Sequence, residues 1–173
     1  MTSAPQPKKL CFQFSTQGND YQDVMIRAYQ HGWCPYTHVD LVGEDGRLLG
    51  ARMDGGVIWR NAGYAPFSEV KTVGLDVSPA AYEAFWIFLQ GQIGKPYDTT
   101  AIALMALPPL FVAIKGAQVA SESRSPTEED SWFCSELAVA ALIAGGVVPT
   151  LPALAKVFTP ADALLVTIVL GGK

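Results

Sequence analysis

Short strand-like runs separated by tight-turn signals limit the possible folds of this chain more than any other feature. The runs are residues 10–15, 37–42, 47–52, 57–60 and 71–77. Glu44-Asp45-Gly46 and Asp54-Gly55-Gly56 stand between consecutive runs. Acidic residues followed by glycine favour the reversals that join neighbouring antiparallel strands. The pattern therefore predicts an antiparallel sheet in the first half of the chain.

Helical patterns flank and interrupt this sheet. Apolar residues recur at helical spacing in residues 20–31, and the pair Ser78-Pro79 predicts a helix that continues to about Ile93. Ser131 is expected to cap a strongly apolar helix over residues 132–144. Strands and helices in separate blocks indicate an α+β fold, in which helices pack against the antiparallel sheet.

The remaining segments are assigned from their breakers and polarity. Residues 98–116 have a helical pattern that is broken near Pro108-Pro109, and residues 117–130 are polar and typical of a mobile loop. A short helix is expected to start near Thr159-Pro160, and a final strand is expected over residues 164–170.

The composition fits one compact domain. Of the 173 residues, 50% are hydrophobic and 16% are charged, so a large core is available. We expect residues 1–9 to be a disordered lead and residues 10–173 to form a single domain. The net charge is −4, with 12 basic and 16 acidic residues, which argues against binding of nucleic acid through phosphate contacts.

No segment has the pattern of an export signal or of a transmembrane helix. The polar start is not followed by an apolar run, and residues 99–114 are shorter than the ~20 residues that a spanning helix needs. We expect the apolar segment 99–116 to be a core helix pair, with contact to a greasy substrate as the alternative. The odd count of cysteines, 3, argues against a disulfide framework and fits a reducing cytoplasmic setting.

Cys134 is the first candidate for chemistry. It lies in the first turn of the predicted apolar helix. Unpaired backbone N–H groups and the positive end of the helix dipole stabilise a thiolate at such a position. The same N–H groups could also stabilise a developing oxyanion. The competing interpretation is an ordinary buried cysteine in a core helix.

His38 is the second candidate. Asp40 follows two residues later on the same predicted strand, so both side chains point to one face of the sheet. A histidine beside a carboxylate can serve as an oriented general base. The competing interpretation is a half-buried strand histidine without a catalytic role.

Tyr97 is the third candidate. It belongs to the segment Gly94-Lys95-Pro96-Tyr97-Asp98, in which glycine and proline mark a sharp break before the next helical pattern. The hydroxyl of Tyr97 could lie beside a reacting group. The structural alternatives are a packed aromatic ring at Tyr97 and a helix cap at Asp98.

A metal site is a further possibility, because His31, Cys34 and His38 have the spacing H-x2-C-x3-H. Zinc sites usually need a fourth ligand and a second closely spaced pair, and the sequence offers neither here. We therefore expect no metal and no other cofactor.

Three segments together resemble a known superfamily. YTHVDLV, GKPYD and WFCSEL are similar to motifs of the NlpC-type papain-like cysteine peptidases, in the circularly permuted branch that contains YiiX-like proteins and lecithin:retinol-acyltransferase-like enzymes. In this branch the histidine strand comes before the tyrosine and cysteine segments, as it does here. The resemblance covers about residues 10–145. It implies a permuted papain-like fold.

The resemblance also implies a role for each candidate. Cys134 matches the nucleophile, His38 the general base, and Tyr97 the hydroxyl on the oxyanion and substrate side. Many relatives carry an acidic residue on the strand after the histidine to orient it, but Gly50 occupies that position here. Asp40 or Asp54 could orient His38 instead, or a backbone carbonyl could do so.

The function expected from these residues is hydrolysis of an amide or ester by a cysteine thiolate. A peptide, a peptidoglycan peptide or a lipid acyl group could be the substrate. Because Gly50 departs from the family pattern, the alternative is an inactive binding or assembly module with the same fold. The sequence does not indicate an oligomeric state.

Overall fold

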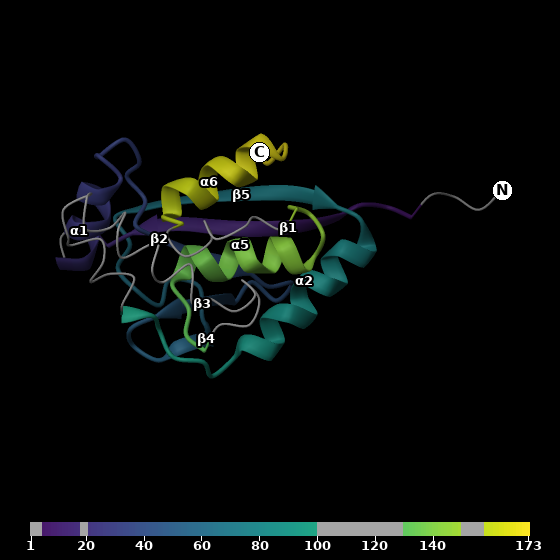
Figure 1. The fold of residues 1–173 in the computed structure, drawn as a ribbon, viewed down its shortest axis with the longest axis horizontal. Coiled ribbons are helices and arrows are strands. Elements are labelled where there is room, and N and C mark those ends of the chain that lie inside the picture. Colours follow the sequence, from purple (N-terminus) through teal and green to yellow (C-terminus); the bar gives the residue numbers. More distant parts are fainter. Residues whose placement is uncertain (1–4, 18–20, 100–129, 150–157) are drawn as a thin grey trace.

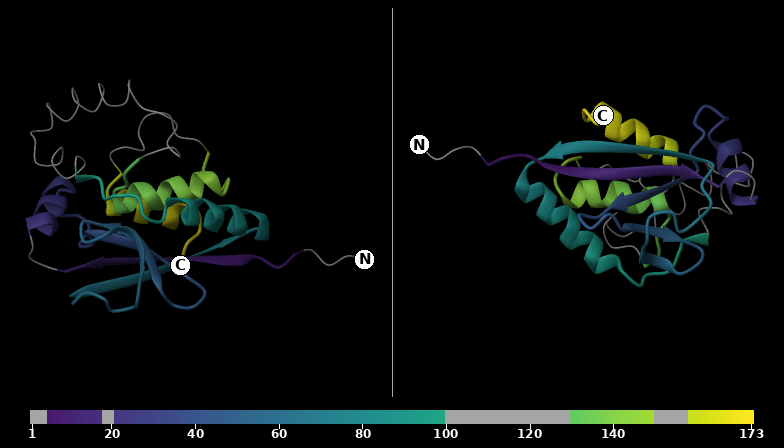
Figure 2. Two further views of the ribbon diagram at one scale, coloured as in Figure 1. Left: turned by 90° about the horizontal axis from the view of Figure 1, so that it is seen from below. Right: turned by 180° about the vertical axis from the view of Figure 1, so that it is seen from behind.

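The computed structural model describes residues 5–17, 21–99, 130–149 and 158–173. An antiparallel sheet of five strands, in the order β4-β3-β2-β1-β5, forms one layer. Helices α2, α5 and α6 cover one face of this sheet, as the left view of Figure 2 shows. This is the α+β arrangement that the sequence predicts.

The described elements follow one another along the chain with helix α1 between the first two strands and the other helices after the last strand. They are β1 (Lys8–Thr16), α1 (Tyr21–Tyr29), β2 (His38–Val42), β3 (Leu48–Arg52), β4 (Gly56–Arg60), β5 (Glu69–Val77), α2 (Pro79–Gln92), α5 (Cys134–Ala144) and α6 (Pro160–Val169). The two predicted turns join β2 to β3 and β3 to β4, and all four neighbouring strand pairs are antiparallel.

The core lies between the sheet and the helices. Phe12 and Phe14 of β1 face the helices and are completely buried, and their partners Leu41 and Val39 on β2 are equally buried. Helix α5 lies between α2 and α6 (Figure 1), and its residues from Cys134 to Leu142 are all buried. A helix that is apolar on every side needs such enclosure. The enclosure fixes the N-terminus of α5 relative to the sheet.

Two predicted boundaries are wrong. The expected strand over residues 164–170 is the body of helix α6 instead. Thr159 caps this helix by accepting a hydrogen bond from Asp162 N, and Pro160 occupies the first turn, so the start signal outweighs the β-branched composition of the following residues. At the other end, Lys8 and Lys9 belong to β1 and pair with β5, so the lead predicted for residues 1–9 is shorter than expected.

The helix pattern predicted for residues 98–116 and the loop predicted for residues 117–130 lie largely outside the described residues, which stop at residue 99 and resume at residue 130. Among the helices that the structure describes, none has the length and apolar character needed to cross a membrane.

Candidate active site

Cys134 is the first residue of helix α5, and its side chain is 1% exposed. The helix therefore begins later than predicted, and Phe133 rather than Ser131 is its N-cap residue. The Glu136 carboxylate accepts a hydrogen bond from the Phe133 N–H at 3.2 Å, which takes up one N–H group of the helix start. Cys134 therefore lies closer to the positive end of the helix dipole than predicted, where the dipole stabilises a thiolate most strongly.

Backbone pairing brings Tyr97 to the start of α5. Tyr97 and Trp132 form an isolated parallel bridge, in which Asp98 N–H donates to the Trp132 carbonyl at 3.0 Å and Trp132 N–H donates to the Pro96 carbonyl at 3.0 Å. The indole N–H of Trp132 donates to Gln92 of α2 at 3.1 Å. The segments GKPYD and WFCSEL, far apart in the sequence, are thus held side by side.

Tyr97 lies within the electrostatic reach of the thiol. Burial and the charge of Cys134 raise the pKa of the Tyr97 phenol, so this group remains protonated over the ordinary pH range. The Tyr97 ring packs against Phe133, with 5.7 Å between the ring centroids. A neutral hydroxyl near Cys134 can act as a hydrogen-bond donor.

His38 connects the thiol to a carboxylate. Its Nε2 lies 2.9 Å from Oδ1 of Asp40, and Cys134 lies within electrostatic reach of the imidazole. Because Nε2 faces Asp40, Nδ1 is the ring nitrogen left for Cys134. Burial by itself lowers the pKa of His38, but the charges of Asp40 and Cys134 outweigh it and raise the pKa to about 10. The Asp40 carboxylate thus favours the imidazolium form of His38.

Asp40 is completely buried, and its surroundings keep it ionised. Burial opposes the charge, but His38, the Tyr64 hydroxyl and the Arg60 guanidinium lower the pKa of the carboxyl below its ordinary value. The Tyr64 hydroxyl donates to Oδ2 at 2.9 Å. Asp40 is therefore the residue that orients His38, whereas Asp54 pairs with Arg52 and Arg60 at the surface.

Gly50 explains how the carboxylate fits. Continuing the pairing of Leu41 with Leu49 places Asp40 opposite Gly50 on β3. A Cβ atom at Gly50 would lie 1.9 Å from Oδ1 of Asp40. The absent side chain on β3 thus makes room for the carboxylate on β2. Many members of the superfamily that the motifs resemble carry an acid at the position of Gly50. In this chain the Asp40 carboxylate occupies the space that Gly50 leaves open.

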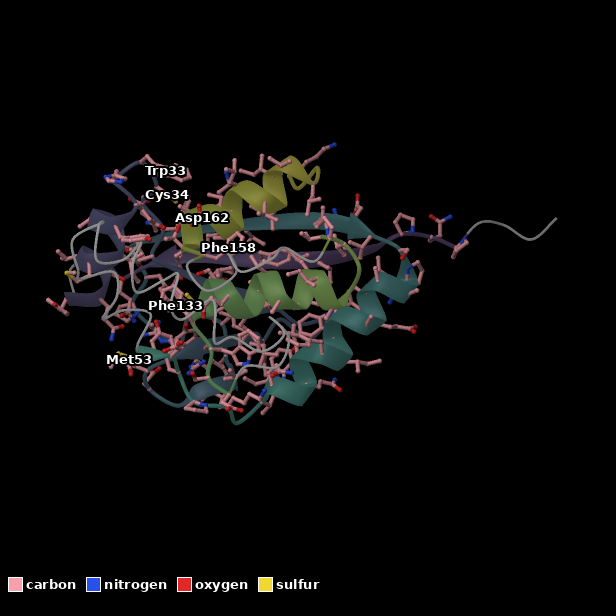
Figure 3. All side chains as sticks on the ribbon, in the orientation of Figure 1. Trp33, Cys34, Met53, Phe133, Phe158 and Asp162 are labelled. Carbon is pink, nitrogen blue, oxygen red and sulfur yellow. The ribbon has the colours of Figure 1, made fainter. Side chains whose placement is uncertain are left out.

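A pocket of about 370 Å³ opens beside His38 and Tyr97. Its lining is mixed, with polar and apolar side chains from α1, the β3–β4 turn and the loop before β5: Gln17, Tyr21, Gln22, Asp23, Ile26, Thr37, Ala51, Arg52, Met53, Asp54 and Phe67. Met53 and Phe133, the neighbour of Cys134, lie at the same end of the molecule in Figure 3. The lining includes His38 and Tyr97 but not Cys134, which is 1% exposed.

The predicted site residues Cys134, His38, Asp40 and Tyr97 come together, whereas the suggested metal ligands do not. Within the described residues, no cluster of three or more histidine, cysteine, aspartate or glutamate side chains is arranged to hold a metal ion. Sequence reasoning missed Tyr64 and Arg60. Tyr64 lies 24 residues after Asp40 in an irregular segment, so no local pattern could have indicated the contact.

Comparison of the chain with protein-family models, with curated proteins and with solved structures gave no significant match.

Proposed function

We propose that this protein is a cysteine hydrolase that cleaves an amide or ester bond, with Cys134 as the nucleophile and His38 as the general base and acid. The observation that supports the proposal most directly is the position of His38, which lies 2.9 Å from Asp40 and within electrostatic reach of Cys134. We propose further that the sheet and helices form a circularly permuted papain-like fold.

The reaction begins with the thiolate of Cys134 attacking the substrate carbonyl carbon. The carbonyl double bond opens to an oxyanion, which the backbone N–H groups at the start of α5 and the Tyr97 hydroxyl can stabilise. When the tetrahedral intermediate collapses, the bond to the leaving group breaks and the His38 imidazolium donates its proton to that group. An acyl-enzyme thioester remains on Cys134.

Water completes the cycle. Neutral His38 takes a proton from a water molecule, which attacks the thioester carbonyl and releases the acid. The imidazolium and the thiolate are restored together. Asp40 holds the ring orientation in both half-reactions and stabilises the imidazolium form, which is the role of the carboxylate in catalytic triads.

The substrate proposed here is a peptide, a peptidoglycan peptide or a lipid acyl ester. The pocket beside His38 carries amide, carboxylate and guanidinium groups as well as aromatic and aliphatic side chains. These groups suit a substrate with its own amides more closely than a long alkyl chain. We propose a cytoplasmic setting, which keeps the three free cysteines reduced.

The decisive experiment is the rate of iodoacetamide alkylation of each cysteine as a function of pH, measured by mass spectrometry. An activated nucleophile predicts that Cys134 reacts with an apparent pKa well below the ~8.5 of a free thiol, and that His38→Ala removes this reactivity. Cys34 is the matched control, because it is also buried and burial raises its pKa.

The burial of Cys134 favours one second candidate, a binding or assembly module that keeps the fold without the chemistry. In that case Cys134 is inert or reacts like an ordinary thiol, and His38→Ala leaves its reactivity unchanged. Either result would reject the hydrolase proposal.

A further inference from the structure

Both oxygens of the buried Asp40 carboxylate have a directed partner. Oδ1 lies 2.9 Å from His38 Nε2, and Oδ2 accepts a hydrogen bond of 2.9 Å from the Tyr64 hydroxyl. A carboxylate that is held at one oxygen only can rotate about its Cβ–Cγ bond. Held at both, it presents Oδ1 to the imidazole in one orientation.

Tyr64 is itself held by the surrounding residues. Arg52 and Arg60 both lie over its ring, with 5.2 Å and 5.4 Å between the guanidinium carbons and the ring centroid. Phe67 meets the ring edge-on at 5.2 Å. Such contacts fix the position of an aromatic ring in a loop that would otherwise allow the ring several positions.

Arg60 ties this arrangement to the sheet. Its side chain donates to the Gly50 carbonyl at 3.0 Å and to the Gly56 carbonyl at 3.3 Å, so the guanidinium is anchored to β3 and β4. The loop that carries Tyr64 is therefore positioned by the strands that flank the candidate active site.

We propose that Tyr64 is a positioning residue of the active site, acting through Asp40 on His38 and Cys134. The catalytic role of this positioning rests on the proposed function. The effect of Tyr64 on the titration of His38 is independent of that function. Burial raises the pKa of Tyr64, so its hydroxyl remains a donor at every pH at which the site works.

The direction in which loss of the Tyr64 hydroxyl shifts the pKa of Asp40 follows from the groups around the carboxylate. Asp40 faces His38 on its own strand, Arg60 on β4 and Tyr64 in the following loop. Removal of the Tyr64 hydroxyl takes away a hydrogen bond that favours the ionised carboxylate, while Arg60 and His38 remain. The pKa of Asp40 must then rise. His38 loses its counter-charge at a higher pH than in the native protein when the solution is acidified.

The experiment is an NMR titration of the imidazole rings in Tyr64→Phe and in the unchanged protein. The chain has 2 histidines, so His31 serves as an internal reference for His38. We expect the acid-side inflection of the His38 shifts to move up by about one pH unit, the size expected for one lost hydrogen bond to a carboxylate.

Tyr82→Phe is the matched control, because Tyr82 also donates its hydroxyl to a carboxylate, that of Glu44 at 3.0 Å, but on the protein surface. This variant should leave the His38 inflection unchanged. A folded Tyr64→Phe protein with an unmoved His38 inflection would overturn the proposal, as would an equal shift in Tyr82→Phe.

A second substitution keeps the test valid if Tyr64→Phe does not fold. A 3,5-difluorotyrosine introduced at position 64 alone preserves the shape of the ring and is a stronger hydrogen-bond donor, so the inflection should move down instead of up. No downward movement would refute the proposal. Neither titration needs a substrate. A shifted inflection with an unreactive Cys134 would therefore support the positioning role and reject the hydrolase.

Discussion

Replacement of Gly50 by alanine tests the central geometric claim about the site. The added Cβ would lie 1.9 Å from Oδ1 of Asp40, the oxygen that faces His38. Strand β3 cannot easily move away, because it is hydrogen-bonded to β2 on one side and to β4 on the other. The Asp40 side chain must therefore shift.

The size of the effect follows from this distance. Real Cβ atoms essentially never approach another heavy atom within 3.0 Å, so the gap must open by roughly 1 Å. Such a movement lengthens the 2.9 Å contact with His38, or the equal contact with Tyr64, beyond hydrogen-bonding range. Overpacking costs about 1–3 kcal/mol and a lost bond to a charged group about 1.5–3 kcal/mol. Together they give an expected loss of about 2.5–6 kcal/mol, whereas a typical domain is stable by about 5–15 kcal/mol.

The assay is urea unfolding combined with pH-dependent alkylation of Cys134. Gly91→Ala is the matched control, because a Cβ at this exposed position of α2 meets no atom within 4 Å and should stabilise the helix by up to about 1 kcal/mol. In the double variant Asp40→Ala/Gly50→Ala the clash is absent, so the two losses should not add. Additive losses, or an unchanged stability of Gly50→Ala, would refute the close approach of Asp40 to Gly50.

Three other outcomes are expected. The pKa of His38 is raised from 6.5 to about 10, so its protonated form stabilises the fold fully below pH 6.5. This stabilisation is lost as the pH rises toward 10. In the variant His38→Gln, the curve of unfolding free energy against pH should be flatter between these two values. Tyr97→Phe should lower kcat by about 100-fold or more without unfolding the protein, as for loss of one oxyanion donor, and unchanged turnover would remove Tyr97 from the mechanism. Thr159→Ala should cost about 1 kcal/mol in chemical denaturation through loss of the α6 cap, while Thr159→Ser should cost much less.

Local signals in the sequence predicted most of the sheet. The turns at Glu44-Asp45-Gly46 and Asp54-Gly55-Gly56 lie between strands that pair with each other, so residues close in the sequence decide the pairing. Ser78 and Pro79 likewise predicted the start of α2 within one residue. These features need only the conformational preferences of a few neighbouring residues.

The same kind of reasoning failed where distant residues decide the structure. The valine and isoleucine content of residues 164–170 favours a strand, but the Thr159 cap and the packing of α6 against the sheet and α5 make them helical. Leu164 and Thr167 lie on the buried side of this helix. The helix start at Cys134 depends on the backbone bridge between Tyr97 and Trp132, which a one-dimensional pattern does not reveal. Tertiary contacts override local propensity in both cases.

The position of Gly50 shows why the orienting carboxylate could be only partly predicted. The spacing of His38 and Asp40 placed both side chains on one face of a strand, and the structure joins them at 2.9 Å. From the sequence, Gly50 counted toward an inactive module, because many members of the superfamily that the motifs resemble carry an acid there. On an antiparallel pair, however, a carboxylate can reach the same space from either strand, provided that the opposite residue has no side chain. A glycine opposite Asp40 is therefore what an oriented His38 requires, and Gly50 gives no support to the inactive alternative.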